Sequence, residues 1–241
     1  MIPKKIHYCW FGRNPKSEEI QRYIASWRKY CPDYELVEWN EDTFDIQSNL
    51  YVKQAYEAKK WAFVSDYVRL YAIYHQGGIY MDTDVEVLKP LDAFLKHDGF
   101  SGFEVDENPL TGIMGCVAGQ PLVKQVLDGY ENRSYILPDG SYDLTVNIVP
   151  FRQVCLEYGL KLDNTFQVVN GFALYPKEYF CPYDFVNKRF VPTENSHTLH
   201  HFAGSWLSKS TRLRRKVSKF IAGLLGPKLT QAIKNVKDKL K

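Results

Sequence analysis

Residues 77–84 impose the strongest local constraint on how this chain folds: they read Gly-Gly-Ile-Tyr-Met-Asp-Thr-Asp. The two glycines can adopt the positive φ that ends a helix, and the apolar residues 79–81 predict a short buried strand. Asp82 and Asp84 follow where that strand ends, at the sheet edge where open α/β sheets bind ligands. Carboxylate oxygens suit Mg²⁺ or Mn²⁺, which complete their shell with water and nucleotide phosphates. The motif therefore predicts a site that holds a nucleotide diphosphate through a metal ion.

The segments that precede this motif predict a parallel sheet. Residues 5–11 are apolar, β-branched or aromatic and predict a first strand. Ser17 is a plausible N-cap for a helix to about Tyr30, and residues 34–39 alternate as a second strand. Strand, helix and strand in this order open a parallel sheet. We therefore expect an α/β fold, Rossmann-like, with a mainly parallel central sheet flanked by helices.

Residues 61–76 predict a buried helix, because apolar side chains occur nearly all round it. Asp66 and Arg69 interrupt this apolar surface and, being three residues apart, share one face. Burying such charges costs several kcal/mol per ion, as a rough guide, unless they are paired or hydrogen-bonded. Two interpretations stay open: a structural ion pair, or a ligand site where this pair meets the carboxylates of Asp82 and Asp84.

The composition fits one large domain. The chain has 241 residues, 45% of them hydrophobic and 15% aromatic. Its five cysteines are scattered and form no Cys-x-x-Cys pair, which argues against a disulfide framework or a zinc site. No apolar signal-peptide core follows Met1, and no apolar run reaches the ~18 residues of a membrane span. We therefore expect a protein of the reducing cytosol.

The charge is divided unevenly along the chain. From Lys209 onward the sequence carries eleven Lys or Arg and one acid, whereas the part before it has a net charge of −7. Apolar residues recur at helical spacing among these basic ones, which predicts an amphipathic tail over residues 208–241 lying on an anionic membrane surface. A helical cap packed on the body is the alternative, and nucleic-acid binding is disfavoured because no such motif accompanies the charge. Residues 1–207 would form the catalytic domain.

Three segments, residues 2–12 (IPKKIHYCWFG), 62–69 (AFVSDYVR) and 77–84, closely resemble glycosyltransferase family 32 in the right order. This group of DXD sugar transferases includes capsular-polysaccharide and yeast-type mannosyltransferases, and large clostridial toxin catalytic domains share its fold. Residues 175–182 and 200–206 resemble the family more weakly. The resemblance implies a GT-A fold and transfer of a sugar from a nucleotide-sugar with retention at the anomeric carbon.

The resemblance also implies roles for individual residues. Asp66 and Arg69 would hold donor-sugar hydroxyls and diphosphate, Asp82 would touch ribose and reach the metal, and Asp84 would bind the metal directly. Together these four form the implied catalytic set, in which a metal and Arg69 stabilise the charge of the leaving diphosphate. The implied donor-binding residues are Ile6, His7, Trp10, Asn40, Ser65, Asp66, Arg69, Tyr80, Asp82, Ser205 and Trp206.

Within that set, Trp10 would stack on the base and Asn40 would lie near the nucleotide, although Trp10 can also be read as an ordinary core tryptophan. Related enzymes supply a late metal ligand just before a glycine, and this pattern implies His201 as the third ligand beside Asp82 and Asp84. His200 could exchange roles with it. Ser205 and Trp206 would close over the diphosphate.

These observations predict a retaining glycosyltransferase that depends on Mn²⁺ or Mg²⁺. We expect it to act at the cytoplasmic face of a membrane, as a peripheral protein, in polysaccharide or glycolipid synthesis. The expected donor is a UDP-sugar, with a GDP-sugar second, and the expected acceptor is a glycan or a lipid-linked glycan. A nucleotide-sugar hydrolase and a non-catalytic carbohydrate-binding scaffold are the alternatives. No second carboxylate nucleophile stands out in the sequence, which favours same-face attack by the acceptor hydroxyl.

Overall fold

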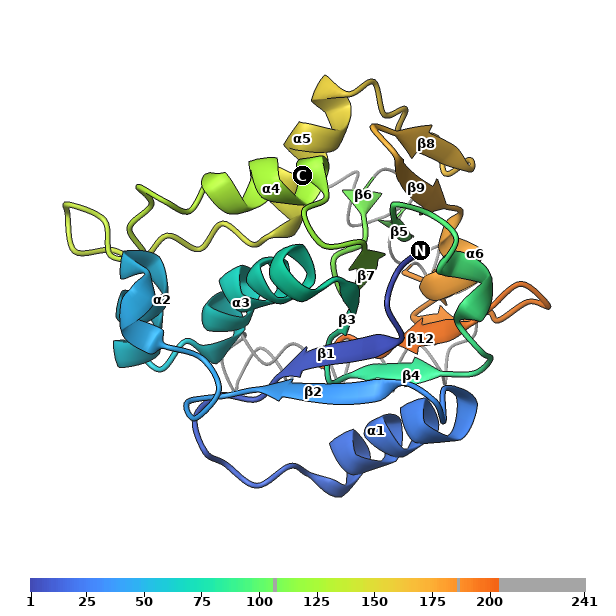
Figure 1. Ribbon diagram of the computed structural model, residues 1–241, viewed down its shortest axis with the longest axis horizontal. Helices are drawn as coiled ribbons and strands as arrows, with labels where there is room; N and C mark the ends of the chain where they lie inside the picture. Colours follow the sequence, from blue (N-terminus) through green and yellow to red (C-terminus); the bar gives the residue numbers. More distant parts are fainter. Residues whose placement is uncertain (106–107, 186, 204–241) are drawn as a thin grey trace, which may run out of the picture.

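A computed structural model describes residues 1–105, 108–185 and 187–203, and these residues form an α/β domain around one mixed sheet (Figure 1). The strand order is β2-β1-β3-β7-β5-β9-β8, and β6 pairs with β5 beside this row. The strands are β1 (Lys5–Cys9), β2 (Glu35–Trp39), β3 (Gly78–Met81), β5 (Gly99–Val105), β6 (Asn108–Pro109), β7 (Ile113–Cys116), β8 (Gln167–Val169) and β9 (Phe172–Tyr175). In this row β2, β1, β3, β5 and β9 run in one direction, and β7 and β8 run against them. The expected mainly parallel sheet is confirmed.

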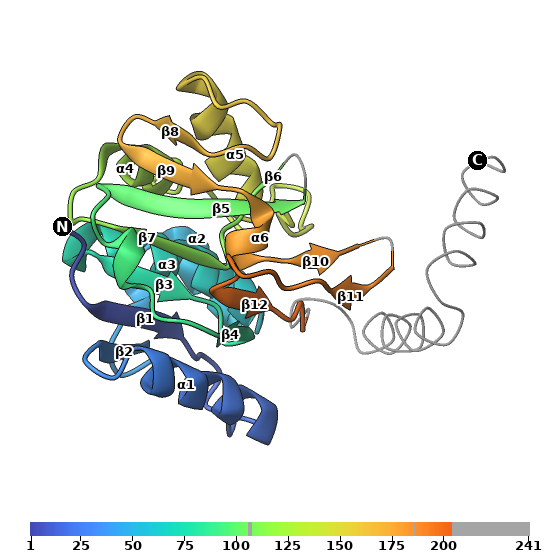
Figure 2. The same ribbon diagram turned by 90° about the vertical axis from the view of Figure 1, so that its right-hand side faces the viewer.

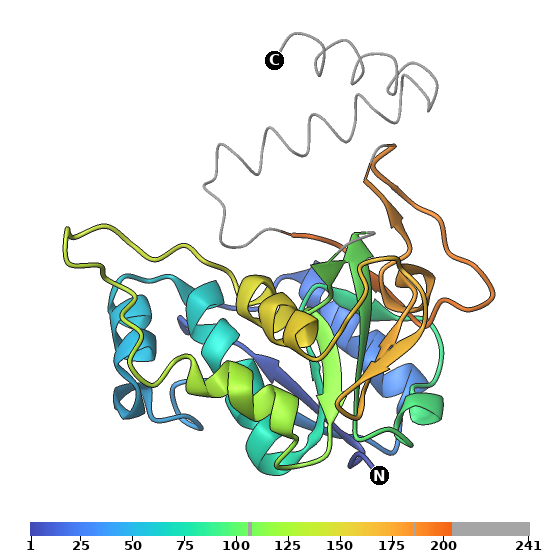
Figure 3. The same cartoon turned by 90° about the horizontal axis from the view of Figure 1, so that it is seen from above.

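Helices cover both faces of this sheet (Figure 3). One apolar cluster joins the side chains of α2, α3, α4 and α5 to one face, and a second joins α1 and α6 to the other. The helices are α1 (Glu18–Tyr30), α2 (Leu50–Glu57), α3 (Trp61–Gln76), α4 (Pro121–Asp128), α5 (Ile148–Glu157) and α6 (Lys177–Phe180), with 3-10 turns at Ile46–Ser48 and Asp92–Phe94. The fold class expected from the sequence, α/β with helices flanking the sheet, is therefore confirmed.

Two short antiparallel ribbons complete the described part (Figure 2). In the first, β4 (Val85–Val87) pairs with β12 (Thr198–His200), and His200 lies opposite Val85. In the second, β10 (Tyr183–Asp184) pairs with β11 (Arg189–Phe190). Because β4 begins directly after Asp84, its pairing with β12 brings a late segment of the chain beside the Asp-x-Asp motif.

Capping and turn residues explain where the helices and strands around the Asp-x-Asp motif begin and end. The Ser17 hydroxyl accepts a hydrogen bond from the Ile20 amide and caps α1, as expected. At the end of α3, Gly77 and Gly78 have φ values of 64° and 106°, a region that other residues avoid. The chain therefore leaves the helix and enters β3 at these two glycines.

Pro150 lies in the first turn of α5, because this helix begins at Ile148. A backbone N–H in the first turn has no intrahelical partner, so the proline requires no kink. Helix α2 has no counterpart among the elements expected from the sequence.

The amphipathic tail expected over residues 208–241 and the boundary after residue 207 lie outside the described residues, as do Ser205 and Trp206. Among the helices that the structure describes, none is long and apolar enough to cross a membrane.

Candidate metal and donor site

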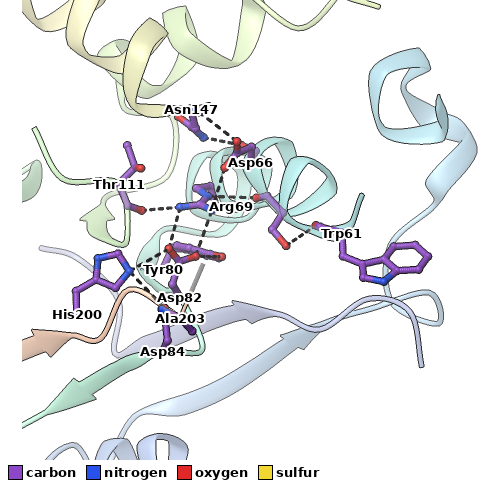
Figure 4. A network of polar contacts seen from close by, with 11 residues as sticks. Trp61, Asp66, Arg69, Tyr80, Asp82, Asp84, Thr111, Asn147, His200 and Ala203 are labelled. Carbon is purple, nitrogen blue, oxygen red and sulfur yellow. Dashed lines mark hydrogen bonds and ion pairs between the residues drawn. The ribbon is translucent and has the colours of Figure 1, made fainter. Parts of the chain in front are cut away.

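The carboxylates of the Asp-x-Asp motif and one histidine converge at the end of β3 (Figure 4). Asp82, Asp84 and His200 each offer a ligand atom, and these atoms all lie within 4.8 Å of one another. The His200 Nε2 atom lies 3.3 Å from Asp84 Oδ1 and 4.0 Å from Asp82 Oδ2. Two carboxylates and one imidazole form a donor set that suits Mn²⁺, and the carboxylates alone suit Mg²⁺. These side chains therefore fit the divalent cation that the motif predicted.

Asp84 is held in place by the segment that follows β12. Its Oδ2 atom accepts a hydrogen bond of 2.7 Å from the Ala203 amide, and its backbone oxygen accepts one of 2.9 Å from the His201 amide. Burial alone would raise the pKa of Asp84, but the charge and hydrogen bond of His200 lower it to about 2. The pKa of His200 is raised to about 9, because the charge of Asp84 outweighs the effect of burial. In the absence of a metal the two side chains form an ion pair.

Asp82 connects this cluster to α3. The Tyr80 hydroxyl donates a hydrogen bond of 2.8 Å to Asp82 Oδ1, and Arg69 Nη2 lies 3.2 Å from the same oxygen. The Asp82 amide donates to the Gly112 carbonyl at 2.8 Å, which fixes the backbone at this point. One carboxylate is therefore shared between a guanidinium and the candidate metal site.

Asp66 and Arg69 are both buried, with exposed fractions of 7% and 5%. Arg69 Nη2 lies 3.0 Å from Asp66 Oδ1, and Nη1 donates to the Thr111 carbonyl at 2.8 Å. The guanidinium also lies over the ring of Tyr80, 4.7 Å from its centroid. The helix pair is thus an ion pair, and it meets the Asp-x-Asp motif through Asp82. Its role as a ligand site stays a prediction.

Asn147 closes the network behind Asp66. Its backbone amide donates to Asp66 Oδ2 at 3.1 Å, and its side-chain amide donates to the Asp66 carbonyl at 2.6 Å. Burial raises the pKa of Asp66 to about 6, against the opposing effect of Arg69. A carboxylate with such a pKa is still ionised at neutral pH and can accept hydrogen bonds from hydroxyl groups.

The structure corrects the identity of the late histidine. His201, expected beside Asp82 and Asp84, points to the other side of the ribbon, where its Nε2 atom lies 2.9 Å from Glu86 Oε2. Its ring stacks on Tyr23 with centroids 4.4 Å apart. Successive side chains of a strand alternate between faces, so only one of two adjacent histidines can reach the carboxylates. That histidine is His200, the alternative named from the sequence.

The other residues expected at the donor site have different surroundings. The side chains of Ile6 and His7 are fully buried, and His7 Nε2 lies 2.8 Å from the Gly77 carbonyl. Burial lowers the pKa of His7. The Ser65 hydroxyl donates to the Trp61 carbonyl at 3.0 Å, and the Ser65 carbonyl accepts from Arg69 Nε at 3.3 Å. In this structure Ile6 and His7 pack within β1, and the Ser65 carbonyl supports Arg69. The donor-binding roles expected for these three residues stay predictions.

Trp10 and Asn40 line one cavity of about 320 Å³ beyond the carboxyl ends of β1 and β2. The Trp10 indole N–H donates to the Asn14 carbonyl at 2.6 Å, and the Lys16 ammonium lies 5.4 Å from the centre of its ring. Trp10 is half-buried, so one part of its ring surface is accessible. The remaining lining residues are Arg13, Asn14, Pro15, Lys16, Glu38, Glu41 and Asp42.

Sequence reasoning missed Asn147, Thr111 and Gly112. Thr111 contributes a backbone carbonyl, which any residue could supply, so the sequence carries no signal for it. Gly112 is a different case: an added Cβ would lie 2.9 Å from His200 Cε1 and 3.3 Å from Asp82 Oδ2. A glycine just before an apolar strand, residues 113–116, is the one signal that could have drawn attention to this point.

The part of the chain that includes α3 and the Asp-x-Asp motif is similar to known proteins. Residues 17–101, which include α3 and the Asp-x-Asp motif, match the glycosyltransferase sugar-binding region containing the DXD motif. Inositol phosphoceramide mannosyltransferase 3 of Schizosaccharomyces pombe is 29% identical over 134 residues, 52% of this chain and 36% of that protein. Subversion of eukaryotic traffic protein A of Legionella pneumophila is 28% identical over 176 residues, 60% of this chain and 27% of that protein.

The chain therefore spans well under half the length of these curated relatives. Among solved structures, the PaToxG glycosyltransferase superposes with a TM-score of 0.48 at 19% identity, over 65% of this chain and 68% of that one. The part of this chain that carries Asp66, Arg69 and the Asp-x-Asp motif is therefore similar to the DXD-containing sugar-binding region of glycosyltransferases.

Proposed function

We propose that this protein is a metal-dependent, retaining glycosyltransferase that moves a sugar from a nucleotide-sugar to a glycan or lipid-linked acceptor. The observation that carries the proposal is the buried network of Asp66, Arg69 and Asp82, continuous with the Asp84 and His200 pair. A purely structural ion pair would need no second carboxylate, and a cation site alone would need no buried guanidinium. Here the ion-pair network and the candidate cation site are continuous, which fits a ligand that has both a diphosphate and a sugar.

Asp82, Asp84 and His200 would hold Mn²⁺ or Mg²⁺ in this site. When bound, such a cation neutralises part of the charge that develops on the leaving diphosphate. Arg69 supplies a second positive charge, and its bonds to Asp66, Asp82 and the Thr111 carbonyl fix the guanidinium before the donor arrives. A charge held in place in a buried site stabilises developing negative charge without reorganisation.

Asp66 would accept hydrogen bonds from hydroxyl groups of the donor sugar. Asn147 holds the Asp66 carboxylate through its backbone amide, which leaves the carboxylate oriented by α5 on one side and Arg69 on the other. A residue fixed from two sides can place the anomeric carbon relative to the diphosphate, and such positioning contributes to the rate.

The cavity beside Trp10 and Asn40 would receive the base of the nucleotide. An accessible indole face can stack on any base, so Trp10 would contribute to affinity for the nucleotide. Specificity for one base would come from the polar groups around the indole. UDP is our first choice and GDP the second. Ser205 and Trp206, which lie outside the described residues, would close over the diphosphate as the resemblance implies.

Three relatives are named inositol phosphoceramide mannosyltransferases, of Schizosaccharomyces pombe, and these names give a lipid as the acceptor. By analogy, we propose a lipid-linked glycan as the acceptor class for this chain. The basic tail over residues 208–241 would place the enzyme on the anionic cytoplasmic surface of a membrane. The products would be polysaccharides or glycolipids.

The test is a thermal-shift screen of UDP-sugars and GDP-sugars, each with Mn²⁺ and with EDTA. A ligand that binds the folded protein raises its stability by mass action, by about 2.7 kcal/mol at a hundredfold excess over Kd. We expect stabilisation by one nucleotide class that disappears in EDTA. Turnover of that donor with and without acceptor then separates a transferase from a hydrolase. Absence of any shift would contradict the proposal and favour a non-catalytic scaffold.

A further inference from the structure

Arg133 anchors the connection between α4 and α5 to α2. This connection passes beside α2 (Figure 1), and the Tyr135 amide donates to Gln54 Oε1 of that helix at 2.8 Å. The Arg133 guanidinium lies over the rings of Tyr51 and Tyr130, 4.8 Å from the centroid of each, and both tyrosines are buried. Such cation–π contacts are stronger where water is largely excluded. The guanidinium is therefore fixed relative to α2.

The same guanidinium binds the returning part of the connection. Arg133 Nε donates to Asp143 Oδ2 at 2.7 Å, and Nη2 donates to the Thr145 carbonyl at 2.9 Å. Asp143 Oδ1 accepts the Thr145 amide at 2.9 Å, which fixes the carboxylate from a second side. Both side chains of this ion pair are 17% exposed, compared with 63% and 67% for the surface pair of Arg13 and Asp42. Shielding from water and the second hydrogen bond make the geometry of the Arg133 pair more specific than that of an exposed pair.

Asn147, two residues after Thr145, contacts Asp66. Its backbone amide donates to the Asp66 carboxylate at 3.1 Å, and its side-chain amide donates to the Asp66 carbonyl at 2.6 Å. Asparagine is a favoured N-cap residue, yet within the described residues the Asn147 side chain makes no capping hydrogen bond to α5. Its carboxamide is thus used on Asp66 instead of on its own helix. Because consecutive Cα atoms lie about 3.8 Å apart, fixing Thr145 also restricts where Asn147 can lie.

We infer that Arg133 is a positioning residue for the donor sugar: it holds residues 143–145 beside α2 and thereby keeps Asn147 on Asp66. The inference rests on the proposed function, in which Asp66 accepts hydrogen bonds from hydroxyl groups of the sugar. Arg133 acts on the sugar only through Asn147 and Asp66.

This role predicts a difference between two parts of the donor. The base would bind in the cavity beside Trp10, and the diphosphate would bind the cation and Arg69. The sugar would depend on Asp66 and, through Asn147, on Arg133. Loss of Arg133 should therefore weaken binding of a nucleotide-sugar and leave binding of the nucleoside diphosphate unchanged. A general loss of stability would instead weaken the binding of both ligands.

The test is calorimetric titration in the presence of Mn²⁺, with UDP, UDP-glucose, GDP and GDP-mannose as probes. We expect Arg133→Leu to lower the affinity for the nucleotide-sugar relative to its diphosphate by about 10-fold, as for the loss of one hydrogen bond. Asp143→Asn is a milder change that removes the charge paired with Arg133, and it should act in the same direction. Arg22→Leu is the matched control, because Arg22 is exposed on α1, across the sheet, and should leave the ratio of the two affinities unchanged.

A second measurement needs no donor. The Asn147 amide donates to Asp66, so in wild type it should exchange slowly with deuterium from the solvent. We expect faster exchange of this amide in Arg133→Leu and in Asp143→Asn, while the amides of β3 keep their rates. In Arg22→Leu all of these rates should equal those of wild type. Nuclear magnetic resonance resolves the amides one by one.

Three outcomes would overturn the inference: a wild-type ratio of the two affinities in folded Arg133→Leu and Asp143→Asn, an equal loss for both ligands, or an unchanged exchange rate of the Asn147 amide. In an Asp66→Ala background, Arg133→Leu should not change the ratio further, because its effect passes through Asp66. A further loss there would also overturn the inference.

Asp66→Ala alone separates this failure from that of the proposed function. If Asp66→Ala keeps the wild-type ratio of the two affinities, the role proposed for Asp66 is wrong. If it lowers the ratio while Arg133→Leu keeps it, only the role of Arg133 is wrong.

Discussion

His200 and His201 are neighbours in the chain but lie in opposite environments: His200 Nε2 is 3.3 Å from Asp84 Oδ1, and His201 Nε2 is 2.9 Å from Glu86 Oε2. Each histidine therefore faces its own carboxylate across the ribbon of β4 and β12. Within the described ranges, the His200 side alone joins a second carboxylate, that of Asp82, and so forms a cluster of three possible ligands.

The two histidines give a matched pair of variants. We expect His200→Ala to weaken Mn²⁺ binding by more than the ~10–100-fold that outer contacts contribute, because it removes a direct ligand. His201→Ala should leave Mn²⁺ affinity near the wild-type value, since His201 contacts Glu86 and Tyr23 instead. Calorimetric titration with Mn²⁺ measures both. If His201→Ala weakened Mn²⁺ binding more than His200→Ala, His201 would be the ligand.

Asp84, which faces His200, and Glu86, which faces His201, give a second matched pair of variants. Asp84→Asn removes a charged ligand while its carboxamide oxygen can still accept the Ala203 amide, so the fold should persist. We expect this variant to lose the Mn²⁺-dependent thermal shift with nucleotide-sugar. Glu86→Gln changes the same charge beside His201 and should keep the shift. A full shift in Asp84→Asn would show that the site is elsewhere.

Arg69 should be essential to folding stability as well as to catalysis. Replacing it by Met leaves the buried carboxylate of Asp66 without its ion-pair partner, at a cost of about 3–5 kcal/mol. In the double variant Asp66→Asn with Arg69→Met, the uncompensated charge is gone, so part of this stability should return. Urea unfolding of the two single variants and the double variant measures the coupling. Strictly additive losses would mean that the two side chains do not form a pair.

The sequence predicted the elements of the site because local signals define them. The cap at Ser17 and the glycines at 77 and 78 act within a few residues of the chain, and α1 and β3 begin or end accordingly. Asp66 and Arg69 were expected to meet the motif because α3 leads directly into β3. Burial of both charges, expected from the apolar surroundings of that helix, is confirmed.

Contacts between segments far apart in the chain could not be predicted from the sequence. Whether His200 or His201 faces Asp84 depends on the register of β12 against β4, where His200 pairs with Val85. A shift of that register by one residue would exchange the two faces. Asn147 reaches Asp66 because residues 131–147 return to α3. No local pattern encodes this approach.

Asp66 should make stability depend on pH in a defined direction. Burial raises its pKa from 3.8 to about 6, so the folded protein binds this proton more tightly than the unfolded chain does. The stability that this proton contributes is complete below pH 3.8 and is lost as the pH rises through about 6. Asp66→Asn mimics the protonated acid and lacks this dependence.

Urea unfolding of wild type and Asp66→Asn from about pH 4 to about pH 7 measures the effect as a difference. We expect the stability of wild type relative to the variant to fall over this interval, without donor or metal present. Other ionisable groups cancel in the comparison because both proteins share them. A difference that is constant, or that rises with pH, would contradict the raised pKa.

Gly112 should control the geometry of the metal site without supplying a ligand. A Cβ at this position would lie 2.9 Å from His200 Cε1 and 3.3 Å from Asp82 Oδ2, so Gly112→Ala must displace one or both side chains. We expect Mn²⁺ binding to weaken by about 10-fold or more, as for other changes that disturb ligand orientation. Gly129→Ala, at the right-handed helical cap of α4, controls for the general effect of an added methyl group and should bind Mn²⁺ normally. Calorimetric titration with Mn²⁺ compares the two variants, with thermal unfolding to show that each is folded. Wild-type affinity in a folded Gly112→Ala protein would mean that His200 and Asp82 do not act together on the metal.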